Sequence, residues 1–334
     1  MRTTLITALL CAASLVSPCA HAQQSEADRQ VLAQLRAKAQ KGDAHAQNEL
    51  GEAYYAGKQG VTSNPVEAVQ WFRQAAEQGN ASAQHHLGLA FYHGEGGLPR
   101  DWQEAIKWFR KAAAQGYVKA QYCLGYMLVL GGREIGAGSA EARQWFHKAA
   151  EQGYPYAQSE LGVYYWGRDP AEAIKWFRKA ADQGDALAYH CLGSMYQAGQ
   201  GVLKDLAKSL KCHRQAAELG WVPAQLRLGE IYANGEGVPV DLAEAVKWYR
   251  MAAEYGDSGA QRELGLRFAE GNGVPTNSVN AYLWFDLAAR SLQDAVNRRT
   301  TLAKQMPPEQ IAEAKRLSAQ FVPRKAPPPP DPPW

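Results

Sequence analysis

Apolar and small residues recur along this chain with the spacing of amphipathic helices, and the whole pattern returns every 31 to 37 residues. The first half of most copies reads A-x-x-x-L-G-x-x-Y, a spacing that places the named residues on one face of a helix. The Leu-Gly pairs that mark these helices are Leu50-Gly51, Leu87-Gly88, Leu124-Gly125, Leu161-Gly162, Leu192-Gly193, Leu228-Gly229 and Leu264-Gly265. We expect this face to pack inward.

The second half of each copy predicts another helix, marked by an aromatic pair and closed by a glycine after two alanines. The aromatic pairs are Trp71-Phe72, Trp108-Phe109, Trp145-Phe146, Trp176-Phe177, Trp248-Tyr249 and Trp284-Phe285. Because these markers keep one phase, they predict a helical hairpin copied seven times. Periods of about 20 to 50 residues are typical of solenoids, propellers and arrays. Without strand-like alternation, the pattern predicts an all-α superhelical solenoid of about seven repeats.

Polar residues predict where the second helix of several repeats begins. In a capping box, the N-cap side chain accepts from the N3 amide while a glutamate at N3 reaches back to the N-cap amide. The matching pairs are Asn64/Glu67, Asp101/Glu104, Asp169/Glu172 and Asp241/Glu244. We therefore expect these carboxylates to be structural. The Gly-x-Gly-Val loops, such as 199–202, are expected to be connections and not phosphate cradles, because no strand precedes them.

Two repeats depart from the pattern. The third has a long predicted loop, Gly131–Ser139, between its two helices. The fifth has Cys212 and His213 where the other repeats have their aromatic pair. We expect the fifth repeat to be the least tightly packed, which makes it a candidate hinge.

These markers define the domain organisation. A capping helix in 23–43 precedes the array, closing helices in 291–322 follow it, and residues 323–334 form a proline-rich tail. The seven predicted repeats are 44–79, 80–116, 117–153, 154–184, 185–220, 221–256 and 257–290. The tail has too little to bury and is typical of a polyproline segment that acts as a spacer or a docking peptide.

The first 22 residues have the features of a secretory signal peptide. Arg2 precedes an apolar run, 5–16, and Ala20-His21-Ala22 is a small-x-small cleavage site. An alternative is a lipid-modified N-terminus at Cys19, although the proline before it fits a lipobox poorly. The run is too short to span a membrane. We expect cleavage after Ala22 and a periplasmic or secreted mature protein without a transmembrane segment.

Composition and charge narrow the function classes. The 334 residues have a net charge of +3 and are 46% hydrophobic. Because glutamates offset the basic residues of the second helices, no nucleic-acid partner is expected.

The pattern predicts no catalytic residue, no cofactor and no metal ligands. His190, Cys191, Cys212 and His213 have ligand chemistry, but adjacent residues on a helix point about 100° apart. The three histidines His85, His86 and His93 could sense pH, although surface histidines are usually solvated.

Three cysteines, Cys123, Cys191 and Cys212, remain after removal of the leader. Cys123 and Cys191 occupy the same position two repeats apart, which is too distant for a bond. Cys191 and Cys212 lie on the two helices of one repeat and are the only plausible pair. An oxidising compartment would favour a disulfide between them.

The repeated motifs resemble the Sel-1-like repeat, a relative of the tetratricopeptide repeat. The resemblance covers residues 44–290, and 306–318 is similar to the final helix of bacterial members. It implies a right-handed α/α superhelix that serves as a scaffold for protein partners, often in bacterial envelopes. Some cysteine-rich relatives have been linked to β-lactam binding, but the paired cysteines that mark them are missing here.

If the first helices line the concave face, as in tetratricopeptide relatives, a stripe opposite the Leu-Gly face would contact a partner. In repeats two to four this stripe is unexpectedly apolar and aromatic. Its candidate binding residues are His85, Leu89, Tyr92, Tyr122, Tyr126, Val129, Val163 and Trp166. Exposed aromatic residues beside hydrophobic ones are typical interface anchors. The alternative is that neighbouring repeats bury some of them.

The sequence therefore favours a non-enzymatic exported scaffold, monomeric, that binds another envelope or secreted protein through this groove. One alternative is a cell-wall enzyme or a protein that binds β-lactams or peptidoglycan. Another is a structural component of an envelope secretion or polysaccharide-export assembly.

Overall fold

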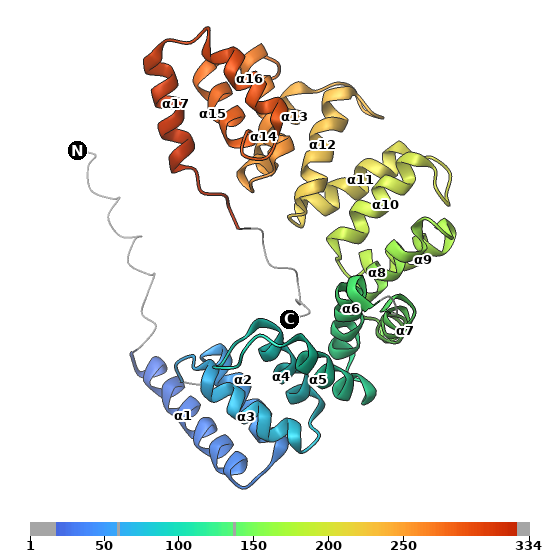
Figure 1. The fold of residues 1–334 in the computed structure, drawn as a ribbon, viewed down its shortest axis with the longest axis vertical. Coiled ribbons are helices and arrows are strands. Elements are labelled where there is room, and N and C mark those ends of the chain that lie inside the picture. Colours follow the sequence, from blue (N-terminus) through green and yellow to red (C-terminus); the bar gives the residue numbers. More distant parts are fainter. Residues whose placement is uncertain (1–17, 59–60, 136–137, 326–334) are drawn as a thin grey trace, which may run out of the picture. The chain divides into compact units, whose positions relative to one another are not determined.

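The computed structural model describes residues 18–58, 61–135 and 138–325, and within these ranges the chain forms seventeen α-helices and no strand (Figure 1). Within the described residues, the chain divides into two compact units, 18–145 and 146–325. The boundary falls within α7 (Gly138–Glu151), in the third repeat and not in the fifth.

The first unit is a row of helices in which each packs on the next. It contains α1 (Pro18–Gln40), α2 (Ala44–Ala56), α3 (Pro65–Glu77), α4 (Ala81–His93), α5 (Trp102–Ala114), α6 (Val118–Ile135) and the start of α7. The contacts run from α1 on α2 through to α5 on α6. The capping role predicted for the leading helix agrees with α1, which buries Leu32 and Leu35 against the first repeat.

The second unit continues with the same hairpins. It contains α8 (Pro155–Trp166), α9 (Pro170–Ala181), α10 (Ala186–Ala198), α11 (Leu206–Glu218), α12 (Val222–Asn234), α13 (Leu242–Glu254), α14 (Ser258–Glu270), α15 (Ser278–Ala288), α16 (Gln293–Ala303) and α17 (Pro308–Gln320). Both α16 and α17 pack on α15. There Tyr282, Met306 and Ala314 form a small buried cluster.

In five hairpins the Leu-Gly glycine contacts the second residue of the aromatic pair, and in the fifth repeat Gly193 contacts His213 in the same way. A Cβ added to Gly88 would lie 2.8 Å from the Phe109 ring, and one added to Gly162 would lie 2.5 Å from Cε1 of Phe177. Only glycine leaves room for a ring so close to a helix backbone. The predicted role of these glycines, close approach of the partner helix, is confirmed.

The predicted capping boxes are half correct. The Asp101 side chain accepts from the Glu104 amide at 3.0 Å, and the other three pairs make the equivalent bond. The N-cap amide, however, donates to a carbonyl of the preceding helix, as Asp101 does to Phe91 at 2.8 Å. The N3 glutamate is therefore free for another partner. In three repeats it pairs with a lysine one turn on, as Glu104 does with Lys107.

A repeated glutamine has a structural role that the sequence pattern did not indicate. Gln84 follows Ala83, the alanine of the A-x-x-x-L-G motif, and is buried, and its side-chain amide donates to the Ala76 carbonyl at the end of the preceding helix. Five other repeats make the same bond, through Gln47, Gln121, Gln158, Gln225 and Gln261. The fifth repeat has Tyr189 at this position. Where the glutamine is present, this bond satisfies a carbonyl at the end of the helix that precedes the repeat.

The structure corrects the prediction of a long loop in the third repeat, and it leaves parts of the leader and the tail outside the described residues. The predicted loop Gly131–Ser139 is mostly helical, because α6 continues to Ile135 and α7 begins at Gly138. Residues 1–17 of the predicted leader and 326–334 of the tail lie outside the described residues, and α1 begins within the leader, at Pro18. The tail's first residues contact α13, where the Arg324 amide donates to the Glu254 carbonyl at 2.8 Å.

Candidate partner-binding surface

The first residue of the predicted stripe is buried in repeats two to four. His85, Tyr122 and Ser159 are each no more than 5% exposed. The His85 ring lies against Phe109 of the same hairpin and against Tyr117, which begins the next one, with centroids 5.6 and 5.3 Å away. Expecting these positions to be exposed was therefore wrong; at His85 the start of the following hairpin covers the ring, which is the alternative that the sequence left open.

The other stripe residues of the first unit stay partly exposed. Leu89, Tyr92 and Tyr126 are half-buried, and Val129 is 49% exposed. With Phe109, Cys123 and Met127, the first three line an apolar hollow of about 10 Å³ between α4, α5 and α6. A volume of that size holds no more than about one water molecule. It is a dimple in a contact surface and not a pocket for a small ligand.

Tyr55 extends this surface into the first repeat. It occupies the position of Tyr92 and Val129, is 48% exposed, and donates from its hydroxyl to Glu95 Oε2 at 2.9 Å. The positions that define the stripe in repeats two to four, applied to the first repeat, would have predicted Tyr55 as a member. We call Tyr55, Leu89, Tyr92, Tyr126 and Val129 the aromatic surface.

Charged groups border the aromatic surface. The Arg100 guanidinium lies 5.6 Å from the centre of the Tyr92 ring, within the range of a cation–π contact. His86 Nε2 lies 3.2 Å from Glu52 Oε1, and this hydrogen bond lowers the pKa of the Glu52 carboxyl. Burial, together with the Glu95 carboxylate, raises the pKa of Tyr55. An apolar centre with a polar border is the usual anatomy of a protein interface.

The remaining two predicted stripe residues belong to the second unit. Val163 is 47% exposed. Trp166 is half-buried, and its indole N–H donates to Gln200 Oε1 at 2.6 Å, in the loop after α10. Its ring also meets Phe177 edge-on at 5.9 Å. Trp166 therefore links neighbouring repeats, a role that its position in the stripe did not indicate.

A second hollow lies on α3, away from the stripe positions. It has a volume of about 330 Å³ and is lined by Val66, Val69, Gln70, Arg73, Gln74, Glu77, Gly96 and Leu98. Most of these residues come from α3, and the last two come from the loop between α4 and α5. No repeated motif marks this hollow in the sequence, because it lies outside the Leu-Gly and aromatic-pair positions.

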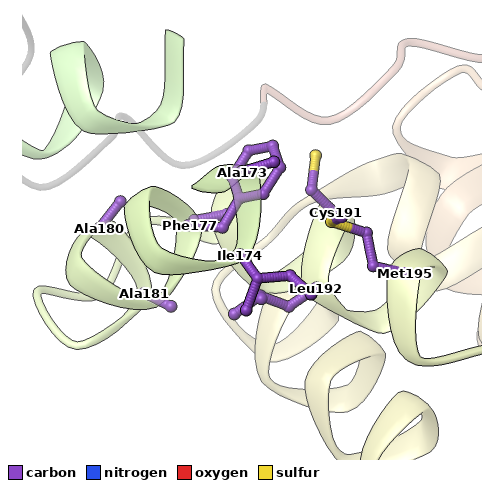
Figure 2. Packing of buried hydrophobic residues seen from close by; sticks show 9 residues of the cluster. Ala173, Ile174, Phe177, Ala180, Ala181, Cys191, Leu192 and Met195 are labelled. Carbon is purple, nitrogen blue, oxygen red and sulfur yellow. The ribbon is translucent and has the colours of Figure 1, made fainter. Parts of the chain in front are cut away.

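Cys191 and Cys212 are both free thiols, so the disulfide considered between them is not formed. Figure 2 shows Ala173, Ile174 and Phe177 of α9 facing Cys191, Leu192 and Met195 of α10. Burial in this cluster raises the pKa of the Cys191 thiol to about 12. Such a thiol is a poor nucleophile, since the thiolate is the reactive form.

Across the described ranges, no set of three or more His, Cys, Asp or Glu side chains is arranged to hold a metal ion. No helix within 18–58, 61–135 and 138–325 combines the length and apolarity needed to cross a membrane.

Comparison with known proteins agrees with this architecture. The Sel1 repeat model matches seven consecutive segments, residues 44–80, 81–117, 118–154, 155–185, 186–221, 222–257 and 258–291. A Sel1 repeat protein from Oxalobacter formigenes is 32% identical, over 83% of this chain and 82% of that one, with a TM-score of 0.66.

The c5321 protein, a protective antigen present in uropathogenic Escherichia coli strains, is 29% identical over 87% of this chain and 79% of its own. Its TM-score of 0.38 is too low to inform function. No curated protein sequence matches the chain. The seven matched repeats and the Oxalobacter structure show that this chain belongs to the Sel1 repeat family.

Proposed function

We propose that this protein is an exported, non-enzymatic scaffold whose aromatic surface binds a segment of another envelope or secreted protein. Repeats of this kind generally mediate protein–protein interactions. The single observation that carries the proposal is the gathering of Tyr55, Leu89, Tyr92, Tyr126 and Val129, partly exposed, along the first helices of three successive repeats.

The chemistry of the aromatic surface supports a protein partner. Tyrosine combines a large apolar ring with a hydroxyl, and such residues dominate interface hot spots. The dimple between Leu89, Tyr92 and Tyr126 is apolar and could seat the tip of one apolar side chain. The bordering Glu52, Glu95 and Arg100 could orient the backbone or charged residues of the bound segment.

Removing the aromatic surface is expected to abolish partner binding. We expect Tyr55→Ser, Tyr126→Ser and Val129→Ser, combined in one variant, to weaken binding at least 30-fold, since a single hot-spot residue contributes roughly 2 kcal/mol or more. The partner would be identified by crosslinking in a periplasmic extract. Its affinity for the purified wild type and variant would then be measured by calorimetry.

Val66→Ser is the matched control, because it removes a 51% exposed apolar side chain of the same unit from the α3 hollow. Circular dichroism would verify that both variants are folded. Unchanged affinity in the triple variant would contradict the proposal, as would a loss in the Val66→Ser control alone.

Export is tested by the mass of the mature chain. If residues 1–22 are a cleaved leader, protein recovered from the periplasm or medium of a Gram-negative host begins at Gln23. Intact mass spectrometry distinguishes this product from a lipid-modified chain beginning at Cys19. Ala22→Arg is expected to block cleavage, because the peptidase needs a small residue there. A chain retained in the cytosol with Met1 in place would contradict export.

A further inference from the structure

The fifth repeat places two imidazole rings together inside the fold. His213 on α11 stands where other repeats have phenylalanine or tyrosine, and it is fully buried, with 0% exposure. Its ring packs on Gly193, where an added Cβ would lie 2.8 Å away. His190 on α10 is partly buried, and its ring centroid lies 5.1 Å from that of His213. The sequence showed that the aromatic pair is replaced here, and it predicted loose packing in this repeat. The His213 ring is instead tightly packed.

The two rings lack the hydrogen bonds that buried imidazoles need. Neither Nδ1 nor Nε2 of His213 has a partner, and Nδ1 of His190 has none either, although all three atoms are buried. A neutral imidazole carries one donor and one acceptor. Leaving such atoms unpaired inside a protein is costly, whereas the phenyl ring used by other repeats avoids that cost. The imidazole therefore brings a property that a phenyl ring cannot supply, namely the ability to take up a proton.

The charged surroundings oppose protonation of both rings. Arg227 of α12 acts on both, and its guanidinium pairs with Glu230 at 2.6 Å and with Glu236. Burial, then the neighbouring His190, then Arg227 lower the pKa of His213 to about 3. Burial and Arg227 also lower the pKa of His190.

Other charged groups on these helices and their neighbours are engaged elsewhere. Arg178 of α9 donates to the Tyr196 hydroxyl at 3.0 Å, and Arg214 of α11 donates to the Tyr232 hydroxyl. Burial and then the Asp185 carboxylate raise the pKa of Glu160 on α8, and burial raises the pKa of Asp185 at the start of α10. None of these groups forms a hydrogen bond with either imidazole. The positive charge of an imidazole protonated in the closed fold would therefore have no compensating partner.

We propose that the His190–His213 pair is an acid-sensitive opening point, at which protonation separates α10 from α11 and withdraws Cys212 of α11 from the apolar cluster that contains Cys191 and Met195. In the closed state the rings are neutral, and in the opened state they are solvated and accept protons near their ordinary pKa of about 6.5. Opening is therefore suppressed above that pH and favoured as pH falls below it. For His213 alone, the opening equilibrium rises about 25-fold between pH 7 and pH 5.

Cysteine labelling provides a local readout in the purified mature chain. Cys191 adjoins His190 on α10 and is 3% exposed, so it reacts only after opening. Cys123, equally buried in the first unit, is the internal reference. A pyridyl disulfide reagent, which reacts in mild acid, would be used from pH 7 to pH 5. Mass spectrometry would resolve each cysteine, with rates divided by that of a small thiol at the same pH.

We expect the corrected rate at Cys191 to rise about 25-fold or more, and the His213→Phe variant to reduce this rise to less than about 5-fold, because His190 alone remains. His213→Tyr, which copies Tyr249 of the next repeat, is a second variant should the first fail to fold. No rise in the wild type, an equal rise in the variants, or an equal rise at Cys123 would overturn the proposal. The outcome is independent of whether the aromatic surface binds a partner.

Discussion

Replacing Phe177 with alanine is expected to lower the free energy of unfolding of the second unit by about 3 to 5 kcal/mol. The Phe177 side chain is fully buried, and its ring fills the space over Gly162. Its neighbours Ile174, Leu192 and Met195 come from two helices and cannot all move into the space it would leave. The lost apolar burial and the remaining cavity therefore both lower the free energy of unfolding.

The measurement must be local as well as global, because repeat arrays lose strict two-state behaviour. Urea unfolding would give the free energy, and hydrogen exchange of peptides from α8, α9 and α10 would locate the loss. Leu203→Ala is the matched control in the same unit. Leu203 is 91% exposed, so its truncation should change stability by less than about 0.5 kcal/mol. Equal effects of the two substitutions would show that the Phe177 contact is not central.

The hairpins could be predicted from the sequence because the same residue types make the same contact in each copy. Leu87 is fully buried, Gly88 admits the Phe109 ring, and Asp101 caps the helix that carries this ring. Each contact joins residues within one repeat. Its signal therefore recurs in most copies and can be separated from chance.

Contacts between repeats were harder to predict. His85 shares a helix face with Leu89, but the next hairpin brings Tyr117 against it and leaves Leu89 half-buried. The period shows which residues share a face, whereas coverage depends on the angle between successive hairpins. The same limit applies to Trp166, whose bond to Gln200 reaches the loop of the following repeat.

The helix ends show a similar limit. The sequence predicted that the Glu104 carboxylate accepts a hydrogen bond from the Asp101 amide, because an isolated helix start offers that amide no other acceptor. In the hairpin, the Phe91 carbonyl of the preceding helix takes that amide. Local rules thus predicted the cap residue correctly and missed the partner supplied by the tertiary fold.

Gly229→Ala is expected to destabilise the second unit, although alanine is the better helix former by about 1 kcal/mol. A Cβ at this position would lie 2.4 Å from Cε1 of Tyr249 and 2.5 Å from Cδ1. Tyr249 is 2% exposed and packs among Leu228, Ile231 and neighbouring residues, so its ring has little room to withdraw. Overpacking of this kind costs about 1 to 3 kcal/mol. After the gain of about 1 kcal/mol in helix propensity is subtracted, we expect a net loss of up to about 2 kcal/mol by urea unfolding.

Gly259→Ala, in the first turn of α14, isolates the effect of the contact from that of the residue type. There the nearest atoms to an added Cβ are Asp257 Oδ1 at 3.2 Å, which accepts from the Ala260 amide, and Leu226 Cδ2 at 3.4 Å, and no ring lies against the position. We expect this substitution to be neutral or stabilising by up to about 1 kcal/mol. Tyr249→Leu should lessen the cost of Gly229→Ala in the double variant, because the smaller side chain vacates the clash. If both glycine substitutions shifted stability in the same direction by the same amount, helix propensity would decide the outcome, and the ring contact would not be the reason for glycine in the Leu-Gly pair.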